Sequence, residues 1–159
     1  MFLEEKIDTL KQKFSAADFR VPFTEGRNIL RSIEKEFIIV KDVTKDLNNL
    51  SQYFNSWPEN IKDKTEIRSI SLPDHTVWLD KLDITTNYWT VIINRESPSL
   101  KNLVYDCKPN ALIALVSIAQ NDFCIIDKKY NWFSYFRVDW QTQQAVILRS
   151  GKNPTPFEI

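Results

Sequence analysis

The residues best suited to molecular recognition gather in one short segment near the C-terminal end of the chain. Tyr130, Trp132, Tyr135, Arg137 and Trp140 all lie there, and Tyr, Trp and Arg are the residue types most enriched at binding hot spots. Alternate residues of a strand face opposite sides, so Trp132 and Tyr135 point in opposite directions. If the sheet is covered on one side only, part of this group faces solvent, and we predict these five as binding residues. If both sides are covered, the rings pack inside.

The candidates for catalysis are few. Cys107 lies just before Pro109 and a helix start, where a thiol pKa can be lowered, whereas Cys124 lies in an apolar strand that favours an inert thiol. Asp80 and Asp83 could in principle perform acid–base chemistry with Asp74, although solvated strand ends and turns are their more ordinary role. We therefore assign no catalytic residue.

Metal and cofactor sites are not indicated. His75 is the only histidine, and its neighbours Pro73 and Asp74 indicate a turn. His75, the two cysteines and one aspartate could form a mixed metal site, but no ligand spacing supports it. The only glycines are Gly26 and Gly151. This excludes the glycine-rich phosphate loops of nucleotide-binding proteins and the nucleophile elbow of hydrolases. We expect no metal and no cofactor.

The net charge, the N-terminal residues and the longest apolar run limit the partners and the compartment of the protein. Its 21 basic and 21 acidic residues cancel, which argues against general nucleic-acid binding, because that affinity comes mainly from neutralising phosphates. The N-terminus has no basic region followed by an apolar one, as a signal peptide would. The longest apolar run, Ala111 to Val116, is far shorter than the roughly 20 residues of a membrane helix. We expect a cytoplasmic protein without a membrane partner.

Two periodicities predict the elements that position these residues. Residues 1–64 are mainly helical, with three apolar stripes at helical spacing; these are Leu3, Ile7, Leu10 and Phe14, then Ile29, Leu30, Ile33 and Phe37, then Leu47, Leu50, Tyr53 and Phe54. Residues 19–23 are expected to be a connector. Residues 65–159 are mainly sheet, because six segments are rich in β-branched and aromatic residues; these are 67–72, 77–82, 88–94, 123–126, 132–138 and 145–149.

One more helix is predicted among the strands. Pro109 suits a first helical turn, and Ala111 to Ala119 contains only Ser117 as a polar residue, so a buried helix is expected at about 110–120. We predict a single α+β domain over residues 1–159: an antiparallel sheet of about six strands with N-terminal helices and this inserted helix, the helices lying mainly on one face.

The segment Phe123-Cys124-Ile125-Ile126-Asp127-Lys128-Lys129-Tyr130-Asn131-Trp132 resembles the C-terminal part of small uncharacterised bacterial cytoplasmic proteins. More loosely, it resembles the SUKH-type immunity superfamily. The resemblance implies an α+β fold and a role in binding a partner protein, often the catalytic domain of a toxin, without catalysis. Only Tyr130 and Trp132 carry over as functional residues.

The predicted function is therefore a non-enzymatic protein-binding domain, with an immunity-type toxin inhibitor as one form. Two alternatives stay open. One is a small enzyme that uses carboxylates or Cys107. The other is a single-stranded nucleic-acid binder, since Lys128, Lys129, Arg137 and Arg149 are interleaved with the aromatic residues.

Overall fold

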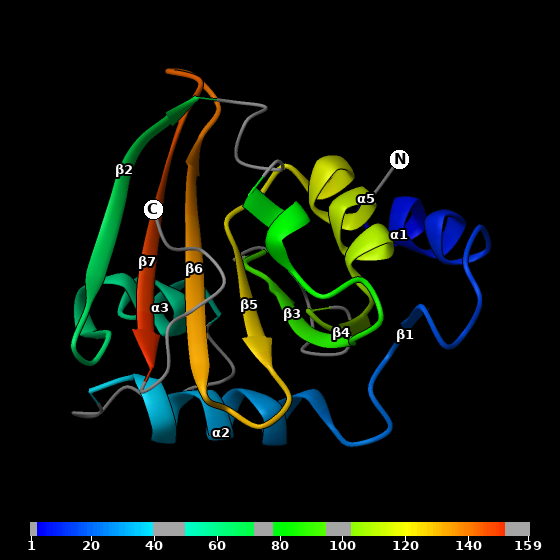
Figure 1. Cartoon of the computed structure of the whole chain (residues 1–159), viewed down its shortest axis with the longest axis horizontal. Coiled ribbons are helices and arrows are strands. Elements are labelled where there is room, and N and C mark those ends of the chain that lie inside the picture. Colours follow the sequence, from blue (N-terminus) through cyan, green and yellow to red (C-terminus); the bar gives the residue numbers. More distant parts are fainter. Residues whose placement is uncertain (1–2, 40–49, 72–77, 95–102, 152–159) are drawn as a thin grey trace.

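The computed structural model describes residues 3–39, 50–71, 78–94 and 103–151 (Figure 1). Within these ranges, the α-helices are α1 (Leu3–Lys11), α2 (Gly26–Phe37), α3 (Leu50–Asn55) and α5 (Pro109–Ala119), and the short 3₁₀ helices are η2 (Pro58–Asn60) and η3 (Trp78–Lys81). The strands are β1 (Phe19–Arg20), β2 (Thr65–Ser71), β3 (Tyr88–Ile92), β4 (Val104–Cys107), β5 (Phe123–Asp127), β6 (Trp132–Asp139) and β7 (Gln144–Gly151).

All seven strands form one antiparallel sheet in the order β1-β4-β3-β5-β6-β7-β2. The longest ladder joins β6 and β7, from Trp132 opposite Gly151 to Asp139 opposite Gln144. The carboxylate of Asp139 accepts hydrogen bonds from the backbone N–H groups of Gln141 and Thr142 in the connecting turn. The prediction of an α+β fold with an antiparallel sheet is confirmed.

Within the described residues the sheet has seven strands rather than about six, because three segments differ from the prediction. Within 77–82, residues 78–81 form η3: Leu79 and Leu82 are buried three residues apart while Asp80 and Lys81 are exposed, which is the period of a 3₁₀ helix and not of a strand. The connector at 19–23 contains the two-residue β1, and β4 was not predicted. Both β1 and β4 are too short to show a clear alternation of apolar and polar residues in the sequence.

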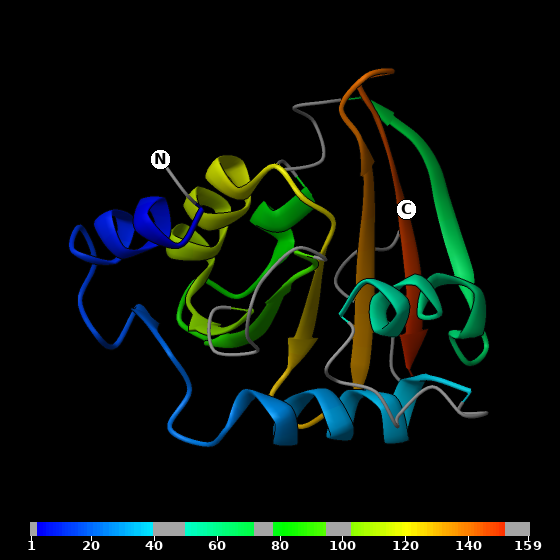
Figure 2. The same ribbon diagram turned by 180° about the vertical axis from the view of Figure 1, so that it is seen from behind.

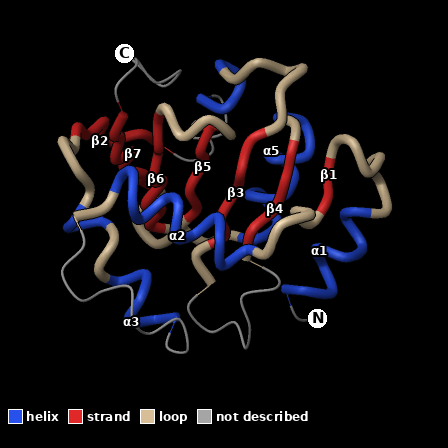
Figure 3. Tube along the Cα trace, turned by 90° about the horizontal axis from the view of Figure 1, so that it is seen from below, coloured by secondary structure: helices blue, strands red, loops and turns tan. Residues whose placement is uncertain are grey.

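Helices cover both faces of the sheet, which corrects the expectation of a single covered face. One buried cluster joins α1, η3 and α5 to one side of the strands. A second cluster joins α2 and α3 to the other side. Figure 1 shows α1 beside α5, and Figure 2 shows α3 over β6 and β7 from behind. Seen from below, α2 runs across the strands from β6 and β7 toward β4 (Figure 3).

The inserted helix α5 is buried as predicted. Ala111, Leu112, Leu115 and Val116 are at most 1% exposed, and Ser117 lies on the exposed side, where its hydroxyl donates to the carbonyl of Ile113. Among the helices of the described ranges, none combines the length and the apolar character that crossing a membrane requires.

Candidate functional site

The five predicted binding residues of the β5–β6–β7 region do not form one exposed surface. Tyr135 is fully buried and Trp132 is 8% exposed. Arg137 is exposed, with a guanidinium nitrogen 3.7 Å from a carboxylate oxygen of Glu59, and Trp140 and Tyr130 are half-buried. Trp132 and Tyr135 are therefore core residues with little or no exposed surface. A binding role for the other three stays a prediction.

The two-sided cover of the sheet is the reason for this burial. Phe136 and Trp132 belong to the cluster under α5, and Phe123 stacks on Phe136 at a centroid distance of 4.5 Å. Tyr135 belongs to the opposite cluster, together with Phe133, which stacks on Phe37 of α2 at 5.5 Å. Alternating residues of β6 thus fill two separate cores, as the period of a strand requires.

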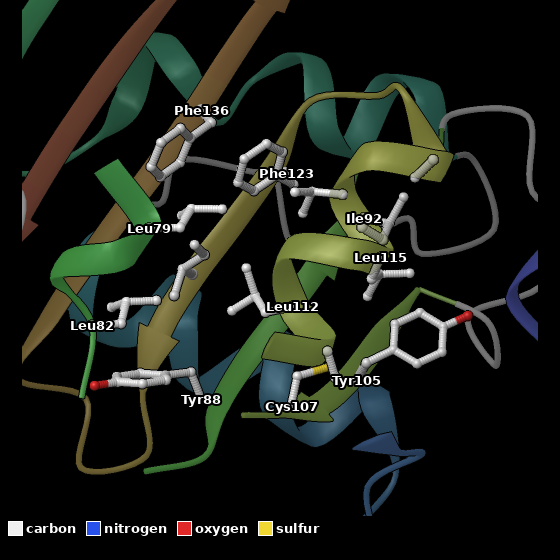
Figure 4. Packing of buried hydrophobic residues seen from close by; sticks show 14 of the residues in the cluster. Leu79, Leu82, Tyr88, Ile92, Tyr105, Cys107, Leu112, Leu115, Phe123 and Phe136 are labelled. Atoms are coloured by element: carbon white, nitrogen blue, oxygen red, sulfur yellow. The ribbon is translucent and has the colours of Figure 1, made fainter. Parts of the chain in front are cut away.

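Cys107 lies inside the first cluster. Its side chain has no exposed surface and contacts residues of α5 and β3 (Figure 4). Burial raises the pKa of the Cys107 thiol far above its ordinary value, and Cys124 is also buried. A thiol that is enclosed and protonated is a poor nucleophile, so the structure argues against the Cys107 form of the enzyme alternative.

The carboxylates singled out in the sequence do not gather in the described part of the chain. Asp83 is exposed, and its carboxylate accepts hydrogen bonds from the hydroxyl and the backbone N–H of Thr85, which lower its pKa. Asp80 is exposed on η3. Asp74 and His75 lie outside the described residues. No group of three His, Cys, Asp or Glu side chains suited to a metal ion occurs within the described ranges.

The most developed polar cluster surrounds Asp106 of β4, whose side chain is 3% exposed. The Arg20 Nε donates to its Oδ2 at 2.9 Å, and the Lys128 Nζ donates to the same oxygen at 2.7 Å. The Asn87 side-chain amide donates to its Oδ1 at 2.9 Å. Two cations therefore share one buried carboxylate.

The sheet register brings this cluster together. Asp106 pairs with Arg20 on β1 and with Trp89 on β3. Residues directly opposite one another on antiparallel strands project on the same face. Lys128 follows β5 two positions after Ile126, which pairs with Trp89. Arg20 and Asp106, which are 86 positions apart along the chain, thus lie side by side on one face of the sheet.

Aromatic rings flank both cations. The Lys128 Nζ lies 4.5 Å from the centre of the Trp89 ring, and the Arg20 guanidinium carbon lies 5.2 Å from that of Phe23. The hydroxyl of Tyr130 faces Trp89 and Ser32, which offset part of the rise in its pKa that burial causes. We call Phe23, Arg20, Lys128, Trp89 and Tyr130 the basic–aromatic strip.

A groove of about 540 Å³ adjoins the strip. It is lined by residues 21–27, between β1 and the first turn of α2, and by Val104 of β4. Pro22 has no backbone N–H, which prevents β1 from continuing along β4 in full pairing. Phe23 is 93% exposed and Val21 is 38% exposed at this groove. Val21, Pro22, Phe23 and Val104 thus place apolar surface next to the cationic cluster, and Glu25 and Arg27 line the same groove.

Sequence reasoning found only Tyr130 and Lys128 of this strip. Trp89 lies in the predicted strand 88–94, and Arg20 and Phe23 lie in the predicted connector. The available signal was the segment Phe19-Arg20-Val21-Pro22-Phe23 itself, since two phenylalanines and a valine-proline step are unusual for a solvated connector.

Comparison of the chain with protein families, with curated proteins and with solved structures gave no match.

Proposed function

We propose that this chain is a protein-binding domain without catalytic activity, and that its contact surface is the basic–aromatic strip with the adjoining groove. The observation that supports it most is Phe23, a large apolar side chain that is 93% exposed at the edge of the groove. Exposed apolar surface next to a concave site is characteristic of partner binding. Aromatic and arginine side chains in such a place are typical anchors.

The scaffold under this surface is well fixed. Arg20 is held by Asp106 and also donates to the backbone carbonyl of Ala16 at 3.2 Å. The Asn87 amide donates to the carbonyl of Ala17 at 2.9 Å. These bonds tie the segment before the groove to β3 and β4, so little conformational entropy would be lost when a partner binds.

An immunity-type toxin inhibitor is the narrower form of this proposal. It is supported by the resemblance of residues 123–132 to that superfamily and by an α+β fold of the kind that the resemblance implies. In this form the partner would be an enzyme, and binding would suppress its activity.

A photo-crosslinking experiment tests the broader form. A photoreactive phenylalanine analogue replaces Phe23 in one variant and Ile84 in a control, because Ile84 is also a large exposed apolar residue, at 76%. We expect the variant with the analogue at position 23 to form a crosslink to one partner protein, and the variant with the analogue at position 84 to form none. Excess unlabelled wild-type chain should compete with this product, and the Phe23→Ser chain should not. Equal products from both positions, or none from position 23, contradict the proposal.

The narrower form needs one further measurement. The enzymatic activity of the captured partner is assayed with and without an equimolar amount of the chain. Suppression by the wild-type chain and none by Phe23→Ser supports an inhibitor, whereas unchanged activity leaves a binding domain of another kind.

A further inference from the structure

The charges around Asp106 do not balance locally. Arg20 and Lys128 carry two positive charges, and both donate to Oδ2 of the single carboxylate. The Lys128 ammonium has three N–H donors and the Arg20 guanidinium has five. Among the described residues, their only hydrogen-bond acceptors are Asp106 and the carbonyl of Ala16. One positive charge and several donors therefore remain available.

These donors are within reach of solvent. The side chains of Arg20 and Lys128 are 29% and 34% exposed, while that of Asp106 is only 3% exposed. Arg20 is half-buried and Lys128 is exposed, and both lie against the buried Asp106 carboxylate. Their interaction with an added anion is therefore stronger than it would be in bulk water, because low-dielectric protein lies on one side of them.

We infer that the basic–aromatic strip binds an acidic segment of the partner protein. A carboxylate of that segment bridges Arg20 and Lys128, and a neighbouring apolar side chain enters the groove beside Phe23 and Val104. Charge complementarity and the adjoining apolar groove carry this inference, which rests on the proposed function. A nucleic acid fits less well, because one excess charge neutralises few phosphates and the chain as a whole is neutral.

The test uses two labelled hexapeptides and the full chain. The first probe is Glu-Asp-Phe-Glu-Asp-Leu with blocked ends, and the second is its amide counterpart Gln-Asn-Phe-Gln-Asn-Leu. We expect fluorescence anisotropy to show binding of the acidic probe that weakens with added salt. The amide probe should bind at least about tenfold more weakly, because hydrogen bonds to ionised groups are roughly twice as strong as neutral ones.

Three variants separate a binding role from a structural one. Lys128→Met should weaken binding of the acidic probe by roughly tenfold. Lys129→Met is the matched control, since Lys129 is the exposed next residue, and it should change affinity by less than about twofold. Asp106→Asn should tighten binding a few-fold, because it removes the carboxylate that competes with the probe and keeps an oxygen to accept from Asn87. A folding defect would weaken binding in every case.

Thermal melts establish that each variant is folded. If Asp106→Asn does not fold, the comparison of the two lysine variants still tests whether the strip binds the acidic probe. Equal binding of both probes, or equal effects of Lys128→Met and Lys129→Met, overturns the inference. Displacement of the acidic probe by a short oligothymidine also overturns it, in favour of nucleic-acid binding. If crosslinking from position 23 captures a partner whose binding is insensitive to Lys128→Met, the inference fails while the proposed function stands.

Discussion

The buried pair of Glu34 and Tyr53 leads to a sharp prediction about stability. Glu34 on α2 is 3% exposed, and Tyr53 on α3 is 2% exposed. The Tyr53 hydroxyl donates to the Glu34 carboxyl group and thereby joins the two helices. Burial raises the pKa of Glu34 above its ordinary value of 4.5, although Tyr53 and Arg31 oppose part of that rise.

The direction of this pKa shift gives the sign of the pH dependence. Below pH 4.5 the carboxyl group is protonated in both the folded and the unfolded chain. As the pH rises, the unfolded chain releases this proton first, so the free energy of unfolding of the wild type falls until the folded pKa is passed. Glu34→Gln cannot ionise and escapes this loss. Between the two pKa values, the variant should gain about 1.4 kcal/mol relative to the wild type per pH unit.

The hydrogen bond itself is tested by Tyr53→Phe. This change keeps the ring contacts with Phe54 and Trp57 but leaves the buried Glu34 carboxyl group without its donor, which should lower the free energy of unfolding by about 1–3 kcal/mol.

Urea titrations followed by tryptophan fluorescence, at several pH values between 4 and 8, measure both effects. Glu36→Gln is the control, because Glu36 is exposed on the same helix and its replacement should change stability by less than about 0.5 kcal/mol. A difference between Glu34→Gln and the wild type that stays constant with pH would refute the reasoning about the buried carboxyl group. A Tyr53→Phe variant as stable as the wild type would refute the energetic role of the hydrogen bond.

Three further predictions concern the interior. Cys107 and Cys124 are buried in opposite clusters, so a thiol reagent at neutral pH should modify neither in the native protein and both in denaturant. Rapid modification of either thiol in the native protein would show that its cluster opens. Phe133→Ala should lower the free energy of unfolding by about 3–5 kcal/mol in a urea titration, because Phe133 has no exposed surface. Gly151→Ala should cost about 1–3 kcal/mol in the same assay, since at φ +137° the new Cβ would lie 2.4 Å from the backbone oxygen of Asn131; an unchanged midpoint would contradict this close approach.

Local sequence patterns were sufficient for the long elements. Five of the predicted strands lie within about two residues of β2, β3, β5, β6 and β7, and the helix at about 110–120 is α5. The strands are rich in β-branched and aromatic residues and α5 is a nearly continuous apolar run, and such composition depends only on neighbouring residues. The predicted face assignment of β6 is also confirmed, with Trp132 and Tyr135 in opposite clusters.

The sequence by itself determined most of the helical and strand segments. It also excluded the glycine-rich phosphate loops, because two glycines cannot supply them. Only the tertiary structure decided that both faces of the sheet are covered, which buries Trp132 and Tyr135. It also decided that Arg20, Asp106 and Lys128 share one site. Their meeting depends on the order and register of strands far apart in the chain, and no short-range pattern specifies which strand a given strand will pair with.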